Sequence, residues 1–253
     1  MKEWIIGRNP VIEVLQAKRR DVFRLLVASG VDEKGRVHEI MSLAASRKIP
    51  IERVPRERLI PMGENPQGVA LEVSAYPYAD LADIFERAAE RKEDLFILIL
   101  DIIQNPQNLG TLLRTAEAAG VHGVIIPLRR AADVTPAVVS ASAGASEHML
   151  IIQENLVRAI DTLKKHDVWV VGLEGSEEAR PIEEVPLTGP LALVVGNEGE
   201  GMRLLVRESC DFLLKLPMHG RIESLNAAVA GSIVIYQVVL ARQKQSPSPQ
   251  EMP

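Results

Sequence analysis

The chain has 253 residues, of which 47% are hydrophobic and 25% charged, and its formal net charge is −5 at pH 7. This composition suits two modest domains with real cores, and no apolar stretch approaches the roughly 20 residues that a membrane span needs. One cysteine excludes an internal disulfide, and the five histidines show no metal-ligand spacing. The N-terminus lacks the pattern of a secretory signal, so we expect a cytoplasmic protein without metal or membrane.

The first segment, residues 1–75, alternates helical and extended patterns. We predict helices over 10–18 and 34–48 and strands at 24–28, 50–54 and 68–73, which together form a small α/β sandwich. This segment holds 13 Lys and Arg against 10 Asp and Glu, whereas the remainder holds 16 against 24. If a nucleic acid binds, we therefore expect it to contact this segment. That the positive charges only form a solvated helix face is an equal alternative.

A hinge follows, because proline and aromatic residues precede a charged helix over 82–94, and we assign residues 76–94 to a linker. Beyond it, buried apolar runs alternate with amphipathic stretches, which predicts a parallel sheet covered on both faces, an open α/β domain over 95–243. The runs are 95–101, 123–127, 148–153, 168–173, 191–196 and 212–217. Ligands of such sheets bind at the carboxyl ends of the strands. The tail, 244–253, is rich in proline and serine and is predicted to be disordered.

The first candidate motif, residues 105–121, directly follows a predicted strand. Asn108 is a plausible N-cap of the helix that starts there, and Arg114 lies off its buried stripe. The two are six positions apart, which is not the spacing of an ordinary helix-surface pair. Both could face the crevice at the strand ends, and the alternative is a helix cap with a solvated arginine.

The second motif is the turn from Val195 to Gly201, VGNEGEG. Its glycines permit positive φ and close backbone approach, while Glu198 and Glu200 disfavour a phosphate. The spacing is not G-x-G-x-x-G, so a dinucleotide is a weak interpretation. The turn therefore favours a cationic or neutral ligand, unless it only caps the following helix.

The third motif begins at Leu216-Pro217-Met218, which ends a strand, and continues into a long apolar helix that Ser224 or Asn226 could cap. Four small residues lie near the start of this helix: Ala227, Ala228, Ala230 and Gly231. They permit close packing against another helix or a second chain. A buried C-terminal helix with a simple cap is the alternative.

In order and spacing, these three motifs resemble the SpoU (TrmH) family of RNA ribose 2′-O-methyltransferases within the SPOUT superfamily. The resemblance runs from Leu95 to about Arg242 and implies a deep trefoil knot, a homodimer and S-adenosylmethionine as cofactor. It implies cofactor contacts from Gly175, Val195, Gly196, Asn197, Leu216, Met218 and Leu225. It implies catalytic or substrate-binding roles for Asn108, Arg114, Glu198, Ser224 and Asn226. Arg114 is the family's candidate for activating the ribose hydroxyl, either as a base or as a clamp on phosphate and alkoxide.

Residues 1–75 resemble the RNA substrate-binding domain that precedes this catalytic domain in the ribosomal RNA subgroup. Pro66-Gln67-Gly68 stands where relatives often have His-Gln-Gly, which leaves the role of that histidine open here. The combination implies 2′-O-methylation of a guanosine in 23S ribosomal RNA. The alternatives are a transfer RNA methyltransferase of the same family and a non-catalytic RNA-binding or ribosome-assembly protein. Binding of S-adenosylhomocysteine, but not ATP, would distinguish the enzyme from the binding protein.

Overall fold

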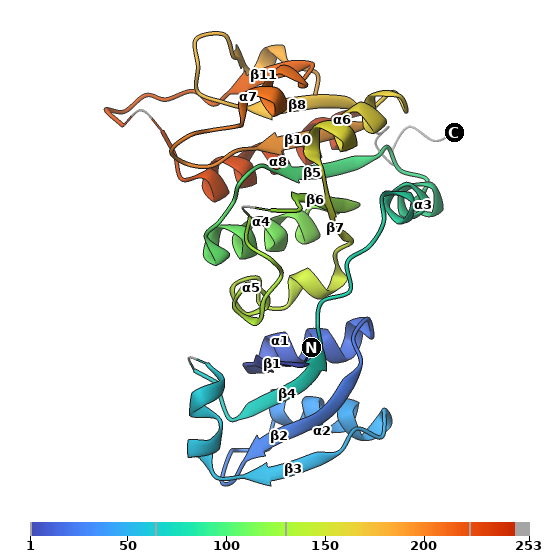
Figure 1. Ribbon diagram of the computed structural model, residues 1–253, viewed down its shortest axis with the longest axis vertical. Coiled ribbons are helices and arrows are strands. Elements are labelled where there is room, and N and C mark those ends of the chain that lie inside the picture. The colour runs from blue at the N-terminus through green and yellow to red at the C-terminus, as the bar shows by residue number, and fades with distance from the viewer. Residues whose placement is uncertain (1, 64, 130, 223, 246–253) are drawn as a thin grey trace. The chain divides into compact units, whose positions relative to one another are not determined.

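The computed structural model describes residues 2–63, 65–129, 131–222 and 224–245, and the chain divides into two compact units (Figure 1). Unit 1 comprises Met1–Pro77, Leu109–Arg114 and Asp133–Met149, and unit 2 comprises Tyr78–Asn108, Thr115–Ala132 and Leu150–Pro253. Two segments of the 95–243 region therefore group with the N-terminal part of the chain. Most of the predicted tail lies outside the described residues.

Unit 1 is built on a four-stranded sheet in the order β1-β4-β2-β3, in which β2 and β3 are parallel and the other pairs antiparallel. Its strands are β1 (Lys2–Ile6), β2 (Val22–Ala28), β3 (Ile51–Val54) and β4 (Val69–Ser74). Its helices are α1 (Arg8–Ala17), α2 (Arg36–Ser46) and α5 (Pro136–Ala141), with the 3-10 turns η1 (Arg56–Arg58), η2 (Ile60–Met62) and η3 (Ala145–His148). The elements predicted for residues 1–75 are all present. The strand β1 was missed.

A buried charge pair holds η3 to the N-terminal part of unit 1. The Arg20 guanidinium donates to both carboxylate oxygens of Glu147 at 2.9 Å and to the Ser74 carbonyl at 3.0 Å, and both charged side chains are fully buried. The Tyr76 hydroxyl donates to the Met149 carbonyl at 2.7 Å, and burial raises its pKa to about 12. Such a pair makes the packing specific, because removing one partner would leave the other charge buried without a counter-charge.

Unit 2 is built on a seven-stranded sheet in the order β7-β6-β5-β10-β8-β11-β9, in which every neighbouring pair is parallel. The strands are β5 (Phe96–Leu100), β6 (Gly123–Pro127), β7 (Ile151–Glu154), β8 (Trp169–Leu173), β9 (Arg180–Pro181), β10 (Leu191–Val195) and β11 (Phe212–Lys215). Each of the six predicted apolar runs coincides with or overlaps one strand, which confirms the predicted parallel sheet. The two-residue β9 was not predicted.

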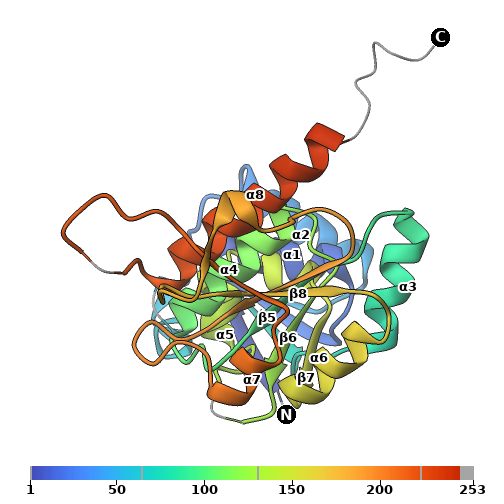
Figure 2. The same cartoon turned by 90° about the horizontal axis from the view of Figure 1, so that it is seen from above.

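Helices cover both faces of this sheet, which is why its strands are apolar throughout. Figure 2 shows α6 and α7 on one side of the strands and α8 on the other. One core joins Ile97 and Ile99 of β5 to side chains of α3, α6 and α7. At Gly123 the α3 helix comes so close that a Cβ atom would stand 2.1 Å from Ile84 Cδ1. The helices are α3 (Leu81–Arg91), α4 (Pro106–Ala118), α6 (Leu156–Lys164), α7 (Leu204–Glu208) and α8 (Ala227–Gln245), with the 3-10 turn η4 (Ile182–Glu184).

Within the described part of the chain, no helix is both long and apolar enough to cross a membrane. The trefoil knot stays a prediction of the family resemblance, because strand order and register do not record threading.

Candidate functional site

A cavity of about 460 Å³ lies in unit 2 at the carboxyl ends of β8, β10 and β11 and the start of α8. This is the edge where open parallel sheets bind ligands. All seven residues that the sequence resemblance assigned to a cofactor line this one cavity, although they come from three separated segments: Gly175, Val195, Gly196, Asn197, Leu216, Met218 and Leu225. Glu198 and Ser224, from the predicted catalytic set, line it as well.

The acidic turn is a closed loop with paired ends. Asn197 and Gly201 exchange two backbone hydrogen bonds, both 3.0 Å, and the Asn197 side-chain oxygen accepts from Gly199 N at 2.9 Å. A Cβ atom on Gly196 would stand 2.5 Å from the carbonyl carbon of Gly201. No side chain fits there without moving backbone, so Gly196 is required for the turn to fold over its own start.

A buried acid fixes the other side of the turn. Asp101 is fully buried at the end of β5, and its carboxylate accepts from the backbone N and the Nε of Arg203, at 2.7 and 2.8 Å. Its own N–H donates to the Val195 carbonyl at 2.8 Å. This residue was not among the predicted site residues, although a lone acid ending an apolar run was the available signal. It anchors the chain on both sides of the turn and does not line the cavity.

Three of the predicted catalytic residues meet beside the cavity. Asn108 Nδ2 donates to Glu198 Oε1 at 2.7 Å, Asn226 Nδ2 donates to Asn108 Oδ1 at 3.1 Å, and Asn226 Nδ2 also bonds Glu198 Oε1. Asn226 Oδ1 accepts from Ala228 N and Val229 N at 3.0 and 3.2 Å and so caps α8. We call these three residues the amide–carboxylate cluster.

The predicted N-cap role of Asn108 is wrong. Asn105 caps α4, since its side-chain oxygen accepts from Gln107 N at 2.8 Å, and Pro106 occupies the first helical position, where its missing N–H costs nothing. Asn108 therefore lies inside the helix, and its amide is free to reach Glu198. The predicted buried stripe of this helix is present, because Leu109, Leu112, Leu113 and Ala116 are all buried.

Arg114 lies on the same helix as Asn108, six residues further on. Its side chain is exposed, and no hydrogen bond or ion pair is described for it within the part of the chain that the structure covers. The structure therefore does not join Arg114 to the amide–carboxylate cluster by direct contact. Ser224 is exposed and lines the cavity.

The charges around the cavity suit a cation or a neutral molecule. Glu174, Glu198 and Glu200 line it, and Arg207 is the one cation among the described residues of its lining. Arg207 is not available to a ligand phosphate, because its Nε donates to both oxygens of Glu174, at 3.0 and 2.8 Å, and its guanidinium also pairs with Glu178. That contact lowers the pKa of Glu178. Apolar side chains of Leu173, Leu216 and Met218 provide contact surface for a flat aromatic group. Carboxylates for a sulfonium and apolar walls for an adenine match S-adenosylmethionine.

Comparison with known proteins agrees with this geometry. Residues 95–236 match the model of the SpoU rRNA Methylase family, and residues 4–79 match the model described as RNA 2′-O ribose methyltransferase substrate binding. A putative TrmH family tRNA/rRNA methyltransferase of Bacillus subtilis, YacO, is 43% identical over 95% of this chain and 96% of its own length. One with the same description from Staphylococcus aureus (strain COL) is 40% identical over 94% and 96%.

Among solved structures, the SpoU methyltransferase AviRb from Streptomyces viridochromogenes, in complex with AdoMet, has a TM-score of 0.80 and 25% identity, covering 97% of this chain and 92% of its own. The family model matches more than half of the chain, and relatives above 30% identity match nearly all of it. The chain therefore belongs to the SpoU rRNA methylase family of S-adenosylmethionine-dependent RNA methyltransferases.

Proposed function

We propose that this enzyme methylates the ribose 2′-oxygen of a guanosine in 23S ribosomal RNA. The observation that carries the proposal is that residues of the second and third motifs line one acidic cavity at the strand ends, beside the amide–carboxylate cluster that Asn108 of the first motif joins. The match of residues 4–79 to a model of a substrate-binding domain supports an RNA substrate. The AviRb complex supports the assignment of AdoMet to the cavity.

The cofactor would be held mainly by backbone and apolar groups. Gly175 and Gly196 present bare backbone, while Leu216, Met218 and Leu225 supply apolar contacts. A Cβ atom on Gly175 would meet nothing within 4 Å, so the wall of the cavity is open at this point. When bound, S-adenosylmethionine supplies an electrophilic methyl group.

The chain's own residues would then have to prepare the ribose hydroxyl. A 2′-hydroxyl is a poor nucleophile, and it must be aligned and lose its proton as the new bond to carbon forms. Because a guanidinium stays protonated in proteins, we assign Arg114 to binding the adjacent phosphate and stabilising negative charge on the oxygen. The proton would leave to a phosphate oxygen or to water. The amide–carboxylate cluster and Ser224 would position the ribose.

We also propose that the enzyme is a homodimer formed through α8. This helix carries apolar residues on its exposed side as well as on its buried side: Val234, Ile235 and Val238 are buried, whereas Val229, Ile233, Tyr236 and Leu240 are 39 to 47% exposed. A helix of this kind is normally covered on every side, and the exposed residues recur at intervals of four, three and four along one stripe. A second copy of the chain would cover that stripe next to the Asn226 cap.

Two measurements test the proposed activity. Calorimetry should detect binding of S-adenosylhomocysteine and not of ATP. Mapping of methylated riboses in a strain that lacks the gene, with and without the gene restored, should reveal one guanosine of 23S ribosomal RNA that depends on it. A dependent site in transfer RNA would move the substrate to that class. If the chain neither binds S-adenosylhomocysteine nor methylates RNA, it is an RNA-binding protein without catalytic activity.

A further inference from the structure

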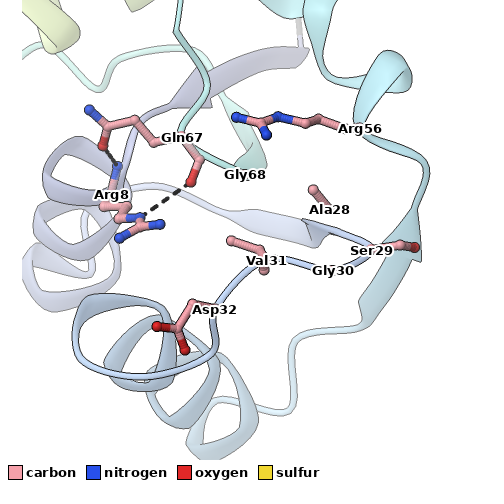
Figure 3. Close-up of a pocket in the computed structure, with 9 residues that line it drawn as sticks. All are labelled: Arg8, Ala28, Ser29, Gly30, Val31, Asp32, Arg56, Gln67 and Gly68. Carbon is pink, nitrogen blue, oxygen red and sulfur yellow. Dashed lines mark hydrogen bonds between the residues drawn. The ribbon is translucent and has the colours of Figure 1, made fainter.

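A second cavity, of about 530 Å³, lies within unit 1 and far along the sequence from the methyltransferase motifs. It opens beyond the carboxyl end of β2, where Ala28 leads into a short loop. It is lined by Arg8, Ala28, Ser29, Gly30, Val31, Asp32, Arg56, Gln67 and Gly68 (Figure 3). Its volume falls within the about 300–1,000 Å³ of typical small-ligand sites and exceeds what a bare anion needs.

The walls of this cavity are fixed by contacts between segments distant in sequence. Ala28 N donates to the Gly68 carbonyl at 2.9 Å, and Ser29 N donates to the Val54 carbonyl at 2.8 Å. Gly68 has a φ of +83°, and a Cβ atom there would stand 2.7 Å from Val31 Cγ2. The cavity is therefore built into the fold of unit 1 and is not a gap between loose loops.

Two arginines line this cavity, and each has guanidinium N–H groups without a described hydrogen-bond partner. Arg8 Nε donates to the Gln67 carbonyl at 3.2 Å, which leaves its two terminal nitrogens without a described partner. Arg56 is exposed on η1, and no hydrogen bond or ion pair of its side chain is described among the residues that the structure covers. Figure 3 shows the Arg56 guanidinium directed toward Gln67 and Gly68, with Arg8 across from it. Neighbouring Arg53, by contrast, is paired with Glu33.

We propose that this cavity binds one unpaired nucleotide of the RNA substrate, an inference that rests on the proposed function. Planar guanidinium groups bind phosphate through two parallel hydrogen bonds and also stack on bases. Proteins recognise folded RNA largely through unstacked nucleotides of loops and bulges. Asp32, the one acid among the described residues of the lining, offers a carboxylate that can accept from the amino group of a base.

The test compares two arginines of the same 3-10 turn. Arg56 lines the cavity and Arg58 does not, yet both are exposed and each substitution by alanine removes one charge. With protein-free 23S ribosomal RNA transcribed in vitro, R56A should raise the KM for RNA about tenfold and lower the slope of log Kd against log salt by about one. In the same assay, R58A should change the KM for RNA by less than about twofold relative to the wild type. Thermal melting should be equal for all three proteins.

Binding to a fully paired RNA duplex separates a nucleotide pocket from general attraction to the backbone. R56A should leave duplex binding within about twofold of the wild type, because a duplex offers no unpaired base. Equal losses for R56A and R58A, or an equal loss of duplex binding, would overturn the pocket. If the wild type neither binds S-adenosylhomocysteine nor methylates, the proposed function fails on its own, and direct binding of the transcript still decides whether Arg56 contacts RNA.

Discussion

At the scale of single residues, Glu198 is the centre of the amide–carboxylate cluster, because its Oε1 accepts from both Asn108 and Asn226. Replacing it with alanine would leave the Asn108 amide without its described acceptor and would remove one of the two acceptors of the Asn226 amide. A hydrogen bond to a charged group contributes about 1.5–3 kcal/mol, so we expect E198A to lower the rate constant of methyl transfer about 10- to 100-fold in a single-turnover assay.

Glu200 provides the matched control for that variant. It is exposed in the same turn, lines the same cavity and carries the same charge, but no contact joins it to the cluster among the described hydrogen bonds. We expect E200A to retain near-normal turnover at saturating S-adenosylmethionine, even where the loss of its charge weakens cofactor binding. Equal losses in E198A and E200A would mean that the turn acts only through its charge, and the positioning role would be lost.

A second pair of variants tests whether the turn needs its glycines for space. A Cβ atom on Gly196 would meet backbone at 2.5 Å, whereas one on Gly199 would approach only the Asn197 side chain, at 3.9 Å. We expect G196A to weaken S-adenosylhomocysteine binding at least about tenfold, since overpacking typically costs about 1–3 kcal/mol. G199A should bind normally. Calorimetry measures both, and normal binding by G196A would show that the turn can open without cost.

At the scale of elements, His122 links the start of β5 to the chain before β6. Its Nδ1 accepts from Phe96 N at 3.0 Å, and its Nε2 lies 3.1 Å from a carboxylate oxygen of Glu93. Acceptance at Nδ1 requires the neutral ring. Burial lowers the pKa of His122 below its ordinary value of 6.5, against the opposing attraction of Glu93.

The sign of the resulting pH dependence follows from this lowered pKa. Above pH 6.5 the ring is neutral in both the folded and the unfolded chain, and its full contribution to the free energy of unfolding is present. As the pH falls below 6.5, the unfolded chain takes up a proton first, so stability declines toward the folded pKa. H122Q, whose amide can still accept from Phe96 N, should show a smaller decline in urea midpoint between pH 8 and 5. If the urea midpoints of the wild type and H122Q decline equally as the pH falls, His122 is excluded as the titrating group.

The elements also mark how far sequence patterns reach. Continuous apolar runs located six strands of the parallel sheet, because burial on both faces leaves no other pattern. The short β9 holds only two residues, and β1 lacks a clear alternation of apolar and polar residues. Neither strand could therefore be distinguished from the neighbouring sequence. The cap of α4 was misassigned because Asn105 and Asn108 are both good caps, and only Pro106 at the first position decides between them.

The site shows the same division. The turn from Val195 to Gly201 indicated a cationic or neutral ligand, and the structure brings that turn together with Leu216, Met218 and Leu225 in one cavity. Contacts that join distant segments could not be predicted. The Arg20–Glu147 pair, which connects the N-terminal part of unit 1 to its Asp133–Met149 segment, joins residues 127 positions apart, and neither side chain has a local pattern that reveals its partner.

At the scale of the whole molecule, the exposed stripe on α8 predicts the state of assembly. Ile233 lies in the middle of that stripe, and an ionised carboxylate buried there without a partner would cost several kcal/mol. We expect I233E to sediment as a monomer at concentrations where the wild type is a dimer, with an unchanged far-UV spectrum. Its methylation activity should fall at least about tenfold if the active site needs the partner subunit.

I60E is the control, because Ile60 is another exposed isoleucine, 63% accessible, and it lies on η2 of unit 1. That variant places the same charge on a surface outside α8 and should remain dimeric. A wild type that is monomeric and fully active would contradict the proposed assembly. A dimeric I233E would instead mean that the copies meet through a different surface, and the apolar stripe of α8 would then need another partner to cover it.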